Sequence, residues 1–132
     1  MQYRKYIHDY HKDNTDNTIG RFKVLHIFEN HKAELFFSTS GSGLFKYSPQ
    51  EETFKCYSKD NNLLYSNYCY YATENQLHEL IVLHNHGISV LDTENHKLLY
   101  THRTPQTSYC QGSSIYCTSD GELYLGGING MV

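Results

Sequence analysis

Histidine side chains are the first candidates for chemistry in this chain of 132 residues, which contains nine of them. His84 and His86 flank Asn85, and two imidazoles so close together could serve as zinc ligands. Zinc sites usually take about three or four protein ligands, and no carboxylate or cysteine recurs beside this pair. We therefore expect no metal site, and we assign both histidines to a hairpin turn.

Patterns typical of catalysis are missing from the sequence. Nucleophilic serines often occupy a Gly-x-Ser-x-Gly elbow, whereas residues 40–43, Ser-Gly-Ser-Gly, are typical of a glycine-rich hairpin. The paired carboxylates of residues 51–52 fall in a predicted turn, where charge keeps an outer hairpin soluble. The glycines of residues 126–130 lie between predicted strands, so no helix dipole is available to bind phosphate. We expect no catalytic residue, no cofactor and no enzymatic activity.

Other oxygen and sulfur ligands predict no further ion site. Residues 13–18 alternate oxygen-bearing side chains, but they lack the central glycine and the closing glutamate of a helix-loop-helix calcium site. The four cysteines show neither a Cys-x-x-Cys motif nor zinc-finger spacing. Most of them lie in apolar strand patterns, where a free cysteine packs as a small hydrophobic residue, and their disulfide status stays open.

A carbohydrate-binding surface fits the residues better, because sugars present apolar ring faces with a rim of hydroxyl groups. Aromatic side chains match the ring faces, and amide and guanidinium groups match the hydroxyls. The candidates come from the linkers 58–67 and 102–113 and from the hairpins near 84–87 and 126–130. We predict an oligosaccharide ligand that contacts Tyr65, His84, Arg103, Gln106, Tyr109 and Asn129.

A repeat in the sequence predicts the elements that must position these loops. Gly43, Gly87 and Gly130 recur at intervals of 44 and 43 residues, and each follows a run that begins with Glu-Leu. A period of about 40 to 45 residues is typical of one four-stranded propeller blade. The loops that carry the candidate residues would then connect the strands of consecutive blades.

Runs rich in Phe, Tyr, Val, Ile and Leu, bounded by turn residues, locate the strands, which we letter A to D from the propeller axis outward. The predicted strands of the first unit span 22–29, 34–39, 43–48 and 53–57, those of the second 67–73, 78–84, 87–92 and 97–101, and those of the third 114–118, 122–126 and a strand from 130. Residues 2–10 precede a Lys-Asp-Asn loop, as strand D does, and are predicted to form an orphan outer strand.

The predicted fold is therefore all-β, a partial β-propeller of about three four-stranded blade-equivalents in the strand order D, ABCD, ABCD, ABC. It forms one domain over residues 1–132, with the orphan strand 2–10, blades at 22–57 and 67–101 and an incomplete blade at 113–132.

Charge and hydropathy exclude several classes of partner. The net charge is −3, and the eleven Lys and Arg residues are scattered, so we expect no nucleic-acid binding. No apolar run approaches the roughly 20 residues that cross a bilayer, so we expect no membrane contact. The first residues lack the apolar core of a secretory signal, which indicates an intracellular protein or an excerpt of a longer chain.

The repeat resembles the two-component regulator propeller repeat. The likeness is carried by residues 43–49, their counterpart 87–93, the strand-D pattern 54–57 and the stretch 119–130. Residues 74–76, Glu-Asn-Gln, depart from the Asp-Gly of the family, and Phe, Ile or Tyr replaces its usual Trp. The resemblance implies a non-enzymatic segment of the periplasmic sensor region of a hybrid histidine kinase, as found in Bacteroides-type bacteria, that responds to a glycan-derived signal. Kinase activity would belong to other parts of a longer protein.

Two alternatives remain open. Closed propellers usually need about four to eight blades, and unpaired strand edges associate readily, so two chains could form a six-bladed ring as a homodimer that serves as a binding or assembly scaffold. A propeller lyase or glycoside-processing enzyme would instead need His, Arg and Tyr clustered near the axis.

Overall fold

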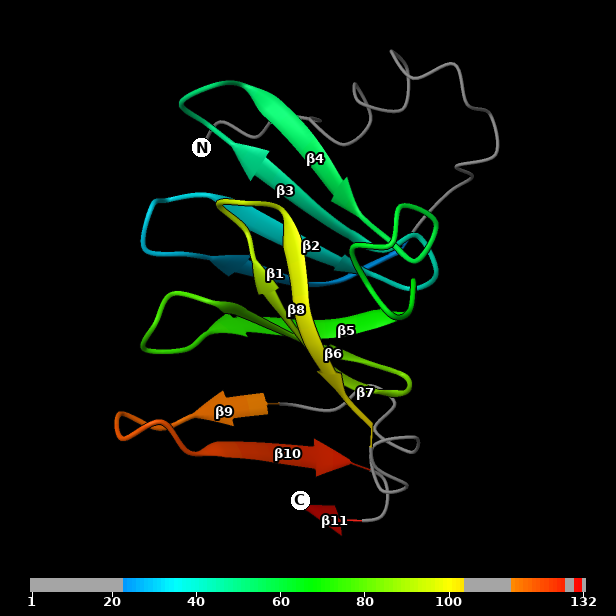
Figure 1. Cartoon of the computed structure of the whole chain (residues 1–132), viewed down its shortest axis with the longest axis vertical. Helices are drawn as coiled ribbons and strands as arrows, with labels where there is room; N and C mark the ends of the chain where they lie inside the picture. The colour runs from blue at the N-terminus through cyan, green and yellow to red at the C-terminus, as the bar shows by residue number, and fades with distance from the viewer. Residues whose placement is uncertain (1–22, 104–114, 128–129, 132) are drawn as a thin grey trace.

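The regular secondary structure of the described residues consists of β-strands. The computed structural model describes residues 23–103, 115–127 and 130–131, which form antiparallel sheets stacked on one another (Figure 1). These ranges contain no helix long and apolar enough to cross a membrane. The predicted orphan strand 2–10 and the loop 13–18 lie outside the described residues.

Each sheet is a meander in which consecutive strands pair. Blade one contains β1 (Val24–Glu29), β2 (Leu35–Thr39), β3 (Leu44–Ser48) and β4 (Thr53–Tyr57), and blade two contains β5 (Cys69–Glu74), β6 (Leu80–His84), β7 (Gly87–Asp92) and β8 (Lys97–His102). Blade three contains β9 (Ile115–Cys117), β10 (Leu123–Gly127) and β11 (Gly130–Met131). Each described strand begins within two residues of its predicted start, and each one with a predicted end finishes within two residues of it. The all-β partial propeller is confirmed, while the domain limits stay a prediction.

The blades meet through their first strands. β1 and β2 of blade one pack against β5 of blade two, and β5 packs against β9 of blade three (Figure 1). The first strands of the three sheets, β1, β5 and β9, therefore lie side by side in that order. This order is the one expected when meanders are arranged around a common axis.

The core lies in the two layers between the blades. Leu80 and Val82 of β6 join a buried cluster with blade one, while Ile81 and Leu83 join a second buried cluster with Ile115 of blade three. All five residues of β6 are buried. Residues 80–83 of this strand are apolar without alternation because neighbouring blades cover both of its faces.

The turn between the first two strands of a blade is held by one asparagine side chain. The Oδ1 atom of Asn30 accepts two backbone N–H hydrogen bonds within its turn, at 3.0 and 2.9 Å, and Oδ1 of Asn75 accepts two at the same distances in blade two. The residues three positions later, Ala33 and His78, take the left-handed conformation at φ 60° and 61°. The asparagine caps thus hold a turn whose left-handed position is occupied by a residue other than glycine.

Candidate ligand-binding site

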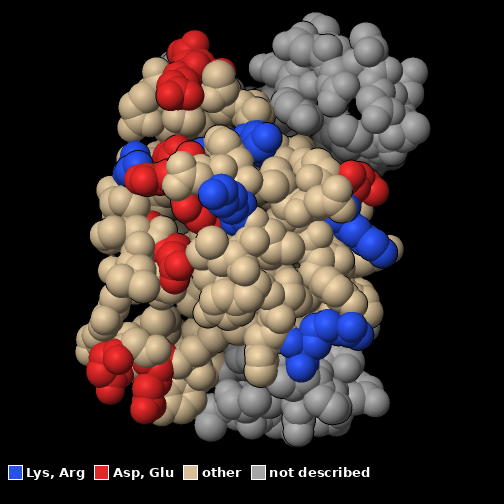
Figure 2. Space-filling view, viewed as in Figure 1, with Lys and Arg blue, Asp and Glu red and all other residues tan. Residues whose placement is uncertain are grey.

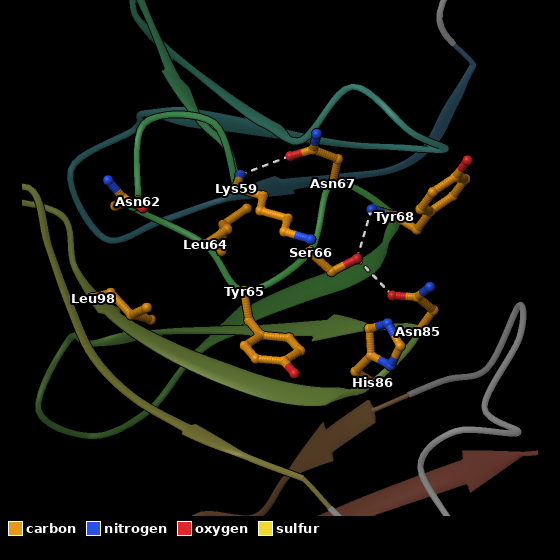
Figure 3. A pocket seen from close by; sticks show the side chains of 10 residues that line it. All are labelled: Lys59, Asn62, Leu64, Tyr65, Ser66, Asn67, Tyr68, Asn85, His86 and Leu98. Atoms are coloured by element: carbon orange, nitrogen blue, oxygen red, sulfur yellow. Dashed lines mark hydrogen bonds between the residues drawn. The ribbon is translucent and has the colours of Figure 1, made fainter.

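A pocket of about 470 Å³ opens between the linker that joins β4 to β5 and the hairpin that joins β6 to β7 (Figure 3). Amide, hydroxyl and aromatic groups share its wall with one lysine. We call it the linker pocket, and its lining residues are Lys59, Asn62, Leu64, Tyr65, Ser66, Asn67, Tyr68, Asn85, His86 and Leu98.

The linker is shaped by its own polar side chains. Oδ1 of Asn61 accepts the backbone N–H of Ser58 at 3.0 Å, and Nδ2 of Asn61 donates to the carbonyl of Cys56 at 2.8 Å. Leu64 fixes the same loop to the protein, because its side chain is buried in the core between blades one and two. The linker is therefore a packed loop whose exposed side chains stand on a fixed backbone.

The linker is also bonded to the hairpin opposite. The Ser66 hydroxyl donates to Oδ1 of Asn85 at 2.5 Å and accepts the backbone N–H of Tyr68 at 3.1 Å. The backbone N–H of Asn85 donates to the carbonyl of Tyr68 at 3.2 Å. Figure 3 shows Ser66 between the two segments, where its bonds set the distance across the pocket.

Three of the predicted ligand-binding residues come together beside this pocket. The ring of Tyr65 lies 5.8 Å from the ring of His84 and 5.5 Å from that of His86, centroid to centroid. The guanidinium carbon of Arg103 lies over the Tyr65 ring, 4.9 Å from its centroid, in a cation–π contact. Tyr65 is thus the centre of an aromatic and cationic cluster. The other predicted residues, Gln106, Tyr109 and Asn129, lie outside the described residues.

His84 supports this cluster from inside the protein. Its side chain is fully buried, its Nδ1 accepts the backbone N–H of His86 at 3.1 Å, and its Nε2 lies 2.9 Å from the hydroxyl of Ser89. Because Nδ1 accepts, the proton of the neutral ring sits on Nε2 and is donated to Ser89. Burial first, and then the nearby charges of His86 and Arg103, lower the pKa of His84 to about 4. Both ring nitrogens are therefore in use, and His84 positions Tyr65.

The chemistry of the linker pocket suits a polar ligand with an apolar face. Tyr65 and Tyr68 line the pocket together with the amides of Asn62, Asn67 and Asn85, and Tyr68 is 49% exposed. Among its described lining residues none is Asp or Glu, so the paired carboxylates of a glycosidase are not part of this wall. The arrangement can stack against a sugar ring and hydrogen-bond its hydroxyls.

Several lining residues were not named from the sequence, although the segments that carry them were. The predicted linker 58–67 and hairpin 84–87 supply most of the wall, but Lys59, Asn62, Asn67 and Tyr68 were not singled out, and His86 was considered only as a zinc ligand. Three asparagines within ten residues of a linker were the available signal. It was ambiguous because asparagine also builds turns, as Asn61 does here.

The cysteines that the structure describes are not bridged to one another. Cys56, Cys69 and Cys117 are free thiols. Burial raises the pKa of Cys56 to about 11, and burial also raises the pKa of Cys69. These two thiols are therefore unreactive at neutral pH and act as packing residues.

Solved structures of known proteins share the fold of this chain. No protein-family model and no curated protein matches the chain. Among solved structures, the extracellular domain of one hybrid two-component system of B. thetaiotaomicron matches 83% of this chain with a TM-score of 0.68 and 23% identity. The extracellular domain of a second such system from the same organism matches 79% of the chain with a TM-score of 0.64 and 20% identity. The matched region spans 15% of each of those structures. The resemblance read from the sequence is thus confirmed at the level of the fold.

Proposed function

We propose that this chain is a segment of the extracytoplasmic sensor region of a hybrid two-component regulator, and that it binds a glycan-derived ligand in the linker pocket without catalysing a reaction. The shared fold with extracellular domains of such systems supports the setting, including a periplasmic location. The structure of the pocket supports the ligand class. Any kinase activity belongs to other parts of a longer protein.

The observation that carries the ligand class is the Tyr65 cluster beside an amide-lined wall. Arg103 lies over one face of the Tyr65 ring, and the half-exposed Tyr68 also lines the pocket. Lys59 adds a positive charge to the wall, which suits a saccharide that carries a carboxylate or sulfate group. Aromatic rings with amides and cations around them are the groups that recognise sugars.

The pocket is placed where a ligand could change the arrangement of blades. One side of it belongs to the linker between blades one and two, and the other to the β6–β7 hairpin within blade two. A ligand that bridges the two sides stabilises the arrangement in which they are close. Binding then shifts the population of conformers, and that shift is the signal passed to the rest of a sensor.

Binding to defined oligosaccharides tests the proposal. An array of neutral, uronic-acid and sulfated oligosaccharides identifies binders, and calorimetric titration measures their affinity. We expect Tyr65→Ala to weaken binding at least about tenfold, because truncating a central aromatic anchor typically costs about 2 kcal/mol or more. Tyr116→Ala is the matched control, since Tyr116 is 68% exposed on blade three and does not line the linker pocket. Equal affinity for the two variants, or no binding to any sugar, would reject the proposal.

A self-associating module is the second candidate, and the two ends of the blade stack favour it. Ile27 alternates with His26 and Phe28, which face blade two, and it is 56% exposed on the opposite side of β1. Tyr116 is 68% exposed on the side of β9 opposite to Ile115, which faces blade two. Apolar residues thus lie on both end faces, where a second copy or further blades could cover them. Light scattering that shows a monomer at all concentrations would reject the homodimer.

A further inference from the structure

Two histidines and a glutamate meet at the junction of blades one and two, on the turns between first and second strands. His31 belongs to the β1–β2 turn, Glu74 ends β5, and His78 belongs to the β5–β6 turn. Their ligand-type atoms all lie within 4.8 Å of one another. Nδ1 of His31 lies 2.6 Å from Oε2 of Glu74, and Nδ1 of His78 lies 3.8 Å from the same oxygen. We call this group the interblade histidine cluster.

The backbone holds each member in place. The backbone N–H of His31 donates to Oε1 of Glu74 at 3.0 Å, which leaves Oε2 directed at the two imidazoles. His78 adopts φ 61°, and its backbone N–H donates to the carbonyl of Asn75 at 3.0 Å. The His31 and His78 rings stack with centroids 3.7 Å apart and planes 23° from parallel. Both imidazoles therefore share one carboxylate oxygen, which is more than a single hydrogen bond between His31 and Glu74 would need.

We propose that the interblade histidine cluster binds one zinc ion through Nδ1 of His31, Nδ1 of His78 and Oε2 of Glu74. Two imidazoles and one carboxylate form a ligand set that zinc uses in proteins, with a further position left for water. Ligands about 2.0 to 2.1 Å from a tetrahedral ion stand about 3.3 Å from one another. The observed 2.6 and 3.8 Å lie on either side of that value, and the stacked imidazoles would rotate to direct both Nδ1 atoms at one ion.

The cluster is accessible to an ion. The side chains of His31 and His78 are 35% and 57% exposed, so the rings have room to rotate and an ion has a path to them. Both histidines also line a pocket of about 380 Å³, whose wall includes the carboxylates of Glu79, Asp92 and Glu94. Figure 2 shows Asp and Glu side chains gathered along the side of the molecule where Figure 1 places these turns. The local field therefore attracts cations.

A zinc ion here would tie blade one to blade two. His31 comes from the first blade, while Glu74 and His78 come from the second. The turn of His31 is already linked to blade two by the ion pair between Lys32 and Glu94. A ligand that binds only the folded chain stabilises it by mass action, so zinc would raise the unfolding temperature.

The test uses the full chain without a histidine tag and Zn²⁺ alone as the probe. We expect one zinc ion per chain by calorimetry, together with a rise in unfolding temperature that Ca²⁺ and Mg²⁺ do not reproduce, because imidazole ligands suit zinc better than those ions. The variants His78→Gln and Glu74→Gln should bind zinc at least about tenfold more weakly. His102→Gln, whose side chain is exposed on β8 outside the cluster, should bind like the original chain.

Two outcomes would overturn the proposal. One is the absence of a zinc-dependent rise in unfolding temperature. The other is unchanged zinc affinity in a folded His31→Gln/His78→Gln variant, which would place the ion on other histidines. Nuclear magnetic resonance can test the site on the unmodified chain, so this test remains available if the variants fail to fold. Zinc should shift the ring signals of His31 and His78 and leave those of His102 in place, and the opposite pattern would also reject the site.

Discussion

The hydroxyl of Tyr57 lies 2.9 Å from Nδ1 of His96, and this bond joins β4 of blade one to the β7–β8 turn of blade two. Tyr57 is fully buried, and burial raises its pKa, so the phenol keeps its proton and donates it. Burial lowers the pKa of His96, which keeps Nδ1 free to accept. The bond is therefore a neutral pair that contributes to the contact between blades near pH 7.

Removing this hydroxyl should weaken the contact between the blades. We expect Tyr57→Phe to lower the free energy of unfolding by about 1 kcal/mol, because it removes the hydrogen bond to His96 that joins the two blades. Urea denaturation measures the change. Tyr100→Phe is the control, since Tyr100 is 57% exposed on β8 and should show a change within about 0.5 kcal/mol. Equal effects of the two substitutions would contradict the assignment.

The glycine that opens β7 should tolerate no side chain. Gly87 has φ 139°, and a Cβ atom there would lie 2.2 Å from the carbonyl oxygen of His102. We expect Gly87→Ala to lower the free energy of unfolding by more than about 3 kcal/mol, from backbone strain and the clash with β8. Gly121→Ala separates the two causes. Gly121 has φ 91° with nothing within 4 Å of its added Cβ, so it should lose only about 1 to 2 kcal/mol. A loss at Gly87→Ala no larger than that at Gly121→Ala would contradict this prediction, because it would show that β8 can shift to make room for the added methyl group.

The fold could be predicted because the same steric requirement, a glycine at the start of the third strand, recurs in each blade and produces the repeat in the sequence. Gly43 is the counterpart of Gly87, and its added Cβ would meet the carbonyl oxygen of Tyr57 at 2.5 Å. In both blades, the first residues of the third strand pass close to the end of the fourth. The asparagine caps of the turns were harder to recognise, because Ala33 and His78 stand at the left-handed position and the hydrogen bonds to Asn30 and Asn75 are visible only in the structure.

The candidate site was predictable by region and less so by residue. Linker and hairpin loops of a propeller lie at one end of the blades, so Tyr65 and Arg103 could be expected near each other. The role of His84 could not be foreseen, since a histidine in a hairpin pattern looks exposed until the burial of β6 is known. The interblade histidine cluster was missed because His31 and Glu74 are 43 residues apart and meet only through blade packing.

Acid should destabilise the chain through His84. Its folded pKa of about 4 lies below the ordinary value of 6.5, so the folded state binds the proton more weakly than the unfolded state does. The stability that the neutral His84 ring contributes is fully present above pH 6.5 and is lost as the pH falls to about 4. The free energy of unfolding should decrease by about 3 kcal/mol over this range.

His84→Gln tests this pH dependence, because the amide can still donate to Ser89 but does not titrate. We expect urea denaturation of this variant to show a smaller loss of stability between pH 6.5 and 4 than the original chain shows. Some loss should remain, because burial also lowers the pKa of His26 and of His96. An unchanged loss, or a ring signal of His84 that titrates near pH 6.5, would contradict the expectation.

Two neighbouring hydroxyl groups in β2 should respond in opposite directions to removal. Ser38 and Thr39 are both fully buried, but the Ser38 hydroxyl has no hydrogen-bond partner among the described residues. The Thr39 hydroxyl donates to the carbonyl of Gly43 at 2.6 Å and accepts the backbone N–H of Ser42 at 3.1 Å. Neither hydroxyl contacts bulk water, so its hydrogen-bond partners within the protein determine whether its removal raises or lowers the free energy of unfolding.

We expect Ser38→Ala to raise the free energy of unfolding by about 1 kcal/mol, because it removes a buried polar group that no bond offsets. Thr39→Val keeps nearly the same shape and removes two bonds, so it should lower the free energy by about 1 to 2 kcal/mol. Urea denaturation of the two variants gives the comparison under one set of conditions. A loss of stability in Ser38→Ala would show that this hydroxyl has a partner, such as a buried water molecule, and that β2 depends on it.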